Sequence, residues 1–260
     1  MIPKTIHYCW FGQSPLPDLT LKCIASWKKY CPGYEIKEWN ELNFDIQKYR
    51  YTEQAYANKK YAFVSDVARF DIIYDEGGIY LDTDVELIRP IDDLLSHHAF
   101  TGYDRKGQVA TGLIFGAEKN SEIAKIMTVQ YAQLDYLSNT KRETLQTVVT
   151  LVTGVLKNSG ISIDGEYSEN SLITLYPWEC FDPYDYEKHR IDVTENTYSI
   201  HHYAGSWLTD LGRQYVEKQI EFDGKYGRFG RVLFLLWEYG LHPLNLVNYI
   251  RYGKLWRQKQ

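Results

Sequence analysis

The stretch SDVARFDIIYDEGGIYLDTDVEL, residues 65–87, gives the clearest indication of the fold in this sequence. Its first half has the apolar spacing of a helix, which we expect over residues 54–76. Gly77 and Gly78 follow, and glycine suits both the positive φ of a helix C-cap and a tight turn into a strand. GGIYLD then reads as a buried strand. A helix, a glycine turn and a buried strand in succession are typical of an α/β protein.

The same alternation extends along the chain on both sides of this stretch. Strands are expected at residues 4–10, 34–39, 77–82, 98–103, 112–117, 172–177 and 198–203. Helices are expected at residues 19–30, 54–76, 120–137 and 144–158. This order predicts a Rossmann-like, mostly parallel central sheet flanked by helices. We expect residues 1–224 to form one domain and residues 225–260 to form a helical C-terminal extension packed on it.

Composition and cysteine usage are those of a soluble globular protein. The 260 residues allow one sizeable core, and most of the 23 Tyr and seven Trp rings are expected to lie in it. Four cysteines without metal-like or disulfide-like spacing predict reduced thiols, as in a cytosol. No secretory signal and no apolar run near about 20 residues is visible, so we expect a cytoplasmic protein.

Charge is distributed unevenly along the chain. Residues 225–260 carry a net charge of +6 and residues 1–224 carry −11. The basic tail contains Trp237, Tyr249 and Trp256, a composition that suits a helix lying on a membrane surface. A helical hairpin packed on the domain, with a solvated basic edge, explains the same pattern. An acidic body with a basic tail argues against nucleic acid as a partner.

Four charged residues of the 65–87 stretch are the candidate functional residues. Asp82 and Asp84 are two apart at the end of a strand, which would put both carboxylates on one side of an extended segment. Paired carboxylates suit Mn²⁺ or Mg²⁺, and such a cation usually shares its shell with substrate phosphates. Asp66 and Arg69 share one helix face, either as a structural ion pair or as part of the same site.

Three blocks of this sequence resemble one known family. IPKTIHYCWFG (2–12), residues 65–87 and HHYAGSW (201–207) are similar to the family 32 glycosyltransferases, a DxD group that includes capsule and exopolysaccharide enzymes and fungal mannosyltransferases. The glucosylating domains of large clostridial toxins are similar more distantly. The resemblance covers residues 1–95 and 198–208. It implies a GT-A fold, a nucleotide-sugar donor, a divalent cation and transfer with retention of anomeric configuration.

The resemblance also implies roles for single residues. Donor-binding positions are Trp10, Asp66, Arg69, Tyr80, Asp82, Ser206 and Trp207. Trp10 would stack on the base, and Arg69 would hold the diphosphate. Asp66, Arg69, Asp82 and Asp84 would form the catalytic group.

A histidine would complete the metal site that the resemblance implies. Asp82 and Asp84 would bind the cation, with Asp84 the more direct ligand. His202 lies three residues before Gly205, as in the His-x-x-Gly of related transferases, and is the expected third ligand. His201 is the alternative, because the register of this block is open.

The expected function is transfer of a hexose from a nucleotide-sugar, with a UDP-sugar favoured, to a saccharide acceptor. Capsule-type relatives imply a lipid-linked oligosaccharide as acceptor, with peripheral contact at the inner face of the cell membrane through residues 225–260. One alternative is a haloacid-dehalogenase-like phosphatase, because LDTDV resembles its Asp-x-Asp-x-Val motif. That motif normally follows the first strand of its domain, however. The other alternative is a non-catalytic sugar-nucleotide-binding protein.

Overall fold

The computed structural model describes residues 1–137, 146–185 and 190–205, together with 218, 225, 226 and 234. The chain divides into two units, and every element named below lies in the unit formed by residues 1–141 and 145–204. Nearly all of the expected C-terminal extension, residues 225–260, lies outside the described residues, and so do Ser206 and Trp207.

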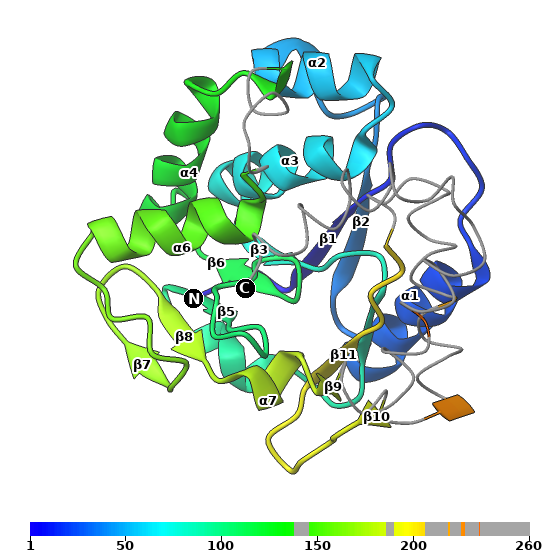
Figure 1. The fold of residues 1–260 in the computed structure, drawn as a ribbon, viewed down its shortest axis with the longest axis vertical. Coiled ribbons are helices and arrows are strands. Elements are labelled where there is room, and N and C mark those ends of the chain that lie inside the picture. The colour runs from blue at the N-terminus through cyan, green and yellow to red at the C-terminus, as the bar shows by residue number, and fades with distance from the viewer. Residues whose placement is uncertain (138–145, 186–189, 206–217, 219–224, 227–233, 235–260) are drawn as a thin grey trace. The chain divides into compact units, whose positions relative to one another are not determined.

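A seven-stranded mixed sheet forms the centre of this unit (Figure 1). Its strands, in spatial order, are β2 (Glu35–Trp39), β1 (Thr5–Cys9), β3 (Gly78–Tyr80), β6 (Phe115–Ala117), β5 (Ala99–Gly102), β8 (Thr174–Tyr176) and β7 (Ser168–Glu169). The pairings leave five strands pointing one way, with β6 and β7 opposed. The predicted α/β class and mostly parallel sheet are confirmed.

Helices cover both faces of the sheet (Figure 1). One face packs against α2 (Arg50–Ala57), α3 (Tyr61–Glu76), α4 (Glu122–Ala132) and α6 (Val148–Asn158). The other packs against α1 (Asp18–Tyr30), the 3-10 helix η2 (Asp92–Ser96) and α7 (Trp178–Phe181). A further 3-10 helix, η1 (Ile46–Lys48), precedes α2. Because side chains alternate along a strand, Ile79 joins the second core and Tyr80 the first.

Two short antiparallel pairs lie outside the main sheet. β9 (Tyr184–Asp185) pairs with β10 (Arg190–Ile191), and β4 (Val85–Leu87) pairs with β11 (Ser199–His201). The second pair joins the end of the 65–87 stretch to the HHYAGSW block, although more than a hundred residues separate them in sequence. This pairing positions the candidate site.

The helix expected over residues 54–76 is two helices in the structure. α2 ends at Ala57, and Lys59 takes a left-handed backbone conformation with φ of 57°. The N–H of Lys60 bonds back to the carbonyl of Ala55 at 2.9 Å, which closes the first helix before α3 begins. Polar residues 58–60 carry no apolar side chain to continue the buried stripe, so the chain turns there.

The two glycines behave as the sequence predicts. Gly77 is the C-cap of α3 with φ of 70°, and its N–H bonds to the carbonyl of Ile73 at 2.9 Å. Gly78 has φ of 108°, and a Cβ there would lie 2.7 Å from the carbonyl oxygen of Thr5 and from Nε2 of His7. Glycine is therefore required both for the turn and for the close contact between β3 and β1.

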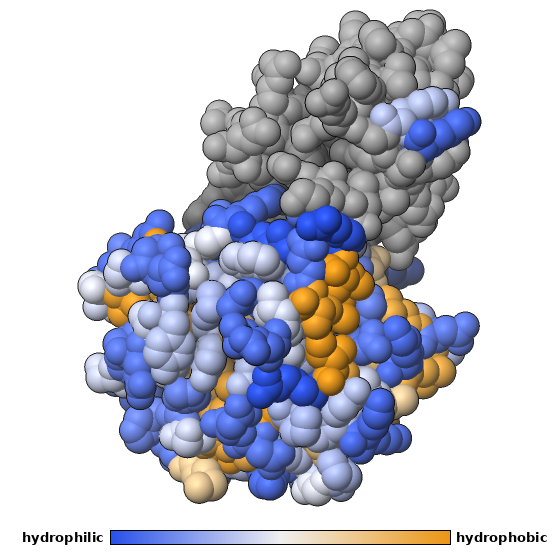
Figure 2. Space-filling model, turned by 90° about the horizontal axis from the view of Figure 1, so that it is seen from below, coloured by the Kyte–Doolittle hydropathy of each residue, from blue (hydrophilic) through white to orange (hydrophobic). Residues whose placement is uncertain are grey.

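The described surface is mainly hydrophilic on the face shown in Figure 2, where a compact apolar patch lies near the middle and smaller apolar areas lie around it. No helix among the described residues is both long and apolar enough to cross a bilayer. The four cysteines are free, as their spacing predicted, and the structure shows that all four are buried: Cys9, Cys23, Cys31 and Cys180.

Candidate functional site

Asp82 and Asp84 lie in a turn between β3 and β4. The N–H of Val85 donates to the carbonyl of Asp82 at 3.0 Å, which closes this turn. Residues 83 and 84 are turn residues, so the expected extended segment with both aspartates on one side is wrong. The carboxylates nevertheless converge, because the turn, rather than strand alternation, brings them together.

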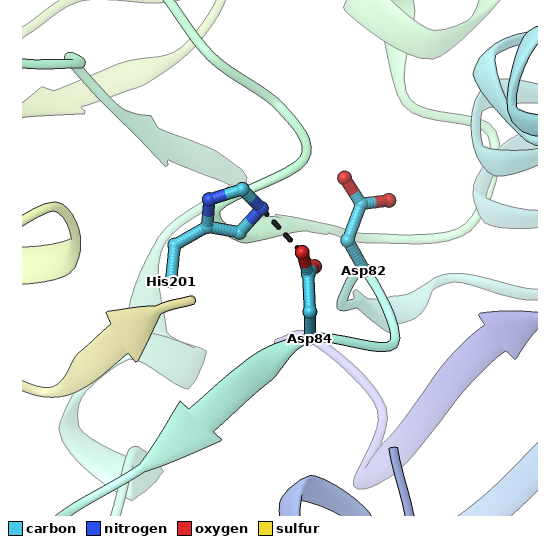
Figure 3. Close-up of side chains that lie close together, drawn as sticks. All are labelled: Asp82, Asp84 and His201. Carbon is cyan, nitrogen blue, oxygen red and sulfur yellow. Dashed lines mark ion pairs between the residues drawn. The ribbon is translucent and has the colours of Figure 1, made fainter. Parts of the chain in front are cut away.

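A histidine from β11 completes a cluster with these aspartates. One ligand atom from each of Asp82, Asp84 and His201 lies within 4.8 Å of the other two. Nε2 of His201 is 3.1 Å from Oδ1 of Asp84. Figure 3 shows the His201 ring and the Asp84 carboxylate directed at one another, with the Asp82 carboxylate beside them. Two residues of the 65–87 stretch and one of the HHYAGSW block thus meet at one point.

His202, the expected metal ligand, faces a different carboxylate. Its Nε2 lies 2.8 Å from Oε2 of Glu86, and Nζ of Lys22 is 2.7 Å from the same oxygen. Successive residues at a strand end point to opposite sides, so only one of the two histidines can face Asp84. The structure places His201 there, which was the alternative at the sequence level.

The backbone after β11 wraps around Asp84. The N–H of Ala204 donates to Oδ2 at 2.8 Å, and the N–H of His202 donates to the backbone carbonyl of Asp84 at 2.9 Å. Burial opposes ionisation of Asp84, but the charge and hydrogen bond of His201 and the Ala204 N–H hold its pKa at about 2. Asp84 is therefore an anion at neutral pH.

His201 is held by charge and by an aromatic contact. Burial would lower the pKa of His201, but the charge and hydrogen bond of Asp84 outweigh it and raise that pKa above its ordinary value of 6.5. The ring of Tyr203 stands edge-on to the imidazole, with 4.0 Å between ring centroids. The position of the imidazole is thereby fixed on two sides.

The Asp66–Arg69 pair of α3 joins the same site. Nη2 of Arg69 lies 2.7 Å from Oδ1 of Asp66 and 3.2 Å from Oδ1 of Asp82. The hydroxyl of Tyr80 donates to the same Asp82 oxygen at 3.0 Å, and the Arg69 guanidinium lies 4.7 Å from the Tyr80 ring centroid. Tyr80 is only 1% exposed, so its hydroxyl holds the Asp82 carboxylate from the buried side of the site. The ion pair expected on the helix is thus connected to the aspartates.

Two carboxylates share the single guanidinium of Arg69. Burial raises the pKa of Asp66 to about 7 despite the opposing charge of Arg69. Burial also raises the pKa of Asp82. Nη1 of Arg69 is buried and has no hydrogen-bond partner among the described residues. A buried donor of this kind is costly unless it is satisfied, which suits a ligand with oxygen acceptors.

Trp10 lies at the same edge of the sheet as the aspartates. β1 and β3 are parallel, with His7 opposite Tyr80, so the residues that follow both strands emerge together. Trp10 is partly exposed, and its Nε1 donates to the carbonyl of Ser14 at 2.6 Å. Stacking of Trp10 on the base of a donor stays a prediction.

The donor atoms of the cluster fit a hard divalent cation. Two carboxylates and one imidazole offer a mainly oxygen ligand set, which suits Mn²⁺ or Mg²⁺ and leaves positions for waters or phosphate oxygens. The anionic state of Asp84 favours a cation further.

Comparison with known proteins relates part of this chain to glycosyltransferases. Residues 17–101 match the family model described as "Glycosyltransferase sugar-binding region containing DXD motif". The matched region contains Asp66, Arg69 and both aspartates of the turn. This supports a relationship to the DXD-containing glycosyltransferases.

Two curated proteins are similar to part of this chain, and one of them is named as a mannosyltransferase. Inositol phosphoceramide mannosyltransferase 3 of Schizosaccharomyces pombe is 33% identical over 103 residues, which cover 38% of this chain and 29% of that protein. Subversion of eukaryotic traffic protein A of Legionella pneumophila is 28% identical over 120 residues, 35% of this chain and 18% of that protein. The matches thus span less than a third of the length of these two relatives.

One solved structure, the PaToxG glycosyltransferase, aligns with a TM-score of 0.48 and 20% identity, covering 61% of this chain and 70% of that one.

Proposed function

We propose that this chain is a family 32 glycosyltransferase that moves a hexose from a nucleotide-sugar, with a UDP-sugar favoured, to a saccharide acceptor, with retention and with a divalent metal. The observation that carries the proposal is the convergence of Asp82, Asp84 and His201 within 4.8 Å. This cluster lies beside a buried Arg69, whose Nη1 has no hydrogen-bond partner in the described part of the chain, and the chain is related to DXD glycosyltransferases.

Asp82, Asp84 and His201 would hold Mn²⁺ or Mg²⁺, which when bound offsets negative charge on the diphosphate of the donor. Arg69 contributes a second positive charge from α3, beside Asp82. Because Asp66, Asp82 and Tyr80 already fix the guanidinium, it needs little reorganisation as charge grows on the leaving group. Trp10 offers a ring for the base of the nucleotide.

We propose that the configuration is retained because the leaving phosphate and the incoming acceptor use the same face of the sugar. The bond from the anomeric carbon to the phosphate oxygen breaks, and the acceptor hydroxyl forms the new bond on the face that the phosphate leaves. The proton of that hydroxyl passes to an oxygen of the departing diphosphate. The role of Arg69 is to stabilise the diphosphate while this exchange occurs.

A thermal-shift panel of UDP- and GDP-sugars, with and without Mn²⁺, tests the proposal. We expect one sugar nucleotide to raise the unfolding temperature, and Mn²⁺ to enlarge that shift, because binding to the native state stabilises it. Absence of any Mn²⁺-enhanced shift across the panel would refute the proposal. Hydrolysis of a generic phosphoester, assayed in parallel, would favour the phosphatase alternative instead.

We further propose a lipid-linked saccharide acceptor of the capsule or exopolysaccharide type, and a cytoplasmic protein that contacts the inner membrane face peripherally. The charge of residues 225–260 supports this proposal, and the relative from Schizosaccharomyces pombe is named as an inositol phosphoceramide mannosyltransferase. In flotation with anionic liposomes, the full chain should float, and a chain ending at residue 224 should not. Equal flotation of the two proteins would contradict the membrane contact.

A further inference from the structure

The segment between β5 and β6 forms a third side of the candidate site, and no block of the family resemblance includes it. The N–H of Asp82 donates to the carbonyl of Gly112 at 3.2 Å, so this segment is bonded directly to the aspartate turn. A Cβ built on Gly112 would lie 2.2 Å from Oδ2 of Asp82 and 3.1 Å from Nη1 of Arg69. Only a residue without a side chain allows this approach.

The backbone of Gly112 does not itself require glycine. Its φ lies outside the left-handed region, whereas Gly77 and Gly78 both have positive φ. The φ of Gly33 also lies outside the left-handed region, but none of the described residues has an atom within 4 Å of a Cβ placed there. Gly112 therefore differs from Gly33 because the Asp82 carboxylate occupies the space that a Cβ would need.

The two oxygens of Asp82 have different surroundings. In the described part of the chain, Oδ1 receives both polar side-chain contacts, from the Tyr80 hydroxyl and from Arg69. Oδ2 is the oxygen that approaches Gly112. A methyl group at position 112 would push this oxygen away, and the carboxylate would then rotate against Tyr80 or shift relative to Asp84.

We infer that Gly112 is a positioning residue for Asp82: the missing side chain lets the carboxylate lie where it meets Asp84 and His201. This inference rests on the proposed function, in which these three residues bind a cation. Gly112 itself need not touch the cation, the donor or the reacting atoms. Its effect is transmitted through Asp82.

The test uses the full chain, with Mn²⁺ alone as the probe in titration calorimetry. The Gly112→Ala variant should bind Mn²⁺ more weakly by about tenfold or more, the range seen when the support of a metal ligand is disturbed. Gly33→Ala, the matched control, should bind as the wild type does. Wild-type affinity in Gly112→Ala would overturn the inference. Absence of Mn²⁺ binding in the wild type would instead overturn the proposed function.

Thermal unfolding of a double variant separates positioning from a general packing defect. Gly112→Ala should lower the unfolding temperature of the wild type, but not that of the Asp82→Ala variant, in which the opposing carboxylate is gone. Equal loss in both backgrounds would mean that the methyl group clashes with something other than Asp82, and would overturn the inference. If Gly112→Ala alone fails to fold, recovery of folding in the double variant supports the inference, and failure there refutes it.

Discussion

The Asp84→Asn variant should lose sugar transfer by about a hundredfold or more while it keeps its fold. Asp84 is the most strongly ionised member of the cluster, with a pKa of about 2, and its Oδ1 faces His201. Asparagine retains the shape, and its carbonyl oxygen can still accept a hydrogen bond from the Ala204 N–H, but it removes the charge that would attract the cation. Donor turnover at saturating Mn²⁺, with circular dichroism to verify the fold, measures the effect.

Glu86→Gln provides the matched control for this variant. Glu86 lies two residues further along the chain and also pairs with a histidine, but this histidine is His202, outside the cluster. We expect turnover within a few-fold of wild type in Glu86→Gln. Near-wild-type turnover in Asp84→Asn, or equal losses in the two variants, would contradict the assignment of Asp84.

The two neighbouring histidines should differ in their effect on metal binding. His201→Gln should weaken Mn²⁺ binding by about tenfold or more, because a ligand at the cluster is lost. His202→Gln should have little effect, because its ring contacts Glu86 instead. Calorimetry of the two variants under the same conditions tests this directly. The reverse order of effects would restore the original sequence-based assignment of His202.

Metal affinity should also depend on pH through His201. The imidazole must lose its proton to bind a metal, and its pKa is raised above 6.5, chiefly by Asp84 acting against burial. Protonated His201 stabilises the metal-free fold at low pH, and this contribution is lost as pH rises through the raised pKa. Mn²⁺ affinity should therefore increase with pH in this region, by up to about tenfold per pH unit. His201→Gln should lose this dependence.

Local sequence signals predicted the parts of the fold and site that depend on neighbouring residues. The turn at Gly77 and Gly78 followed from the conformational needs of a helix C-cap, and the structure confirms it. Asp66 and Arg69 were placed on one face by helix spacing alone. Residues 58–60 were missed as a helix break, because no proline or glycine marks it and the left-handed Lys59 depends on its surroundings.

Contacts between distant segments set the details that the sequence left open. Whether His201 or His202 faces Asp84 depends on the register of β11 against β4, where His201 lies opposite Val85. That register is a property of the pairing and cannot be read from either strand alone. Gly112 carried no local signal either, because its need for a missing side chain comes from Asp82, thirty residues earlier in the sequence.

The pairing of β4 with β11 also has a consequence for how the protein folds. Residues 85–87 and 199–201 can meet only after the intervening chain has been arranged, and such long loop closures are slow steps. The cluster at Asp84 would then be among the last features to form. A nascent chain in which residue 201 has not yet been synthesised would lack it. A cation that binds at this cluster would stabilise only the fully folded chain. Incomplete folding intermediates would then be unable to bind the cation or to react with the donor.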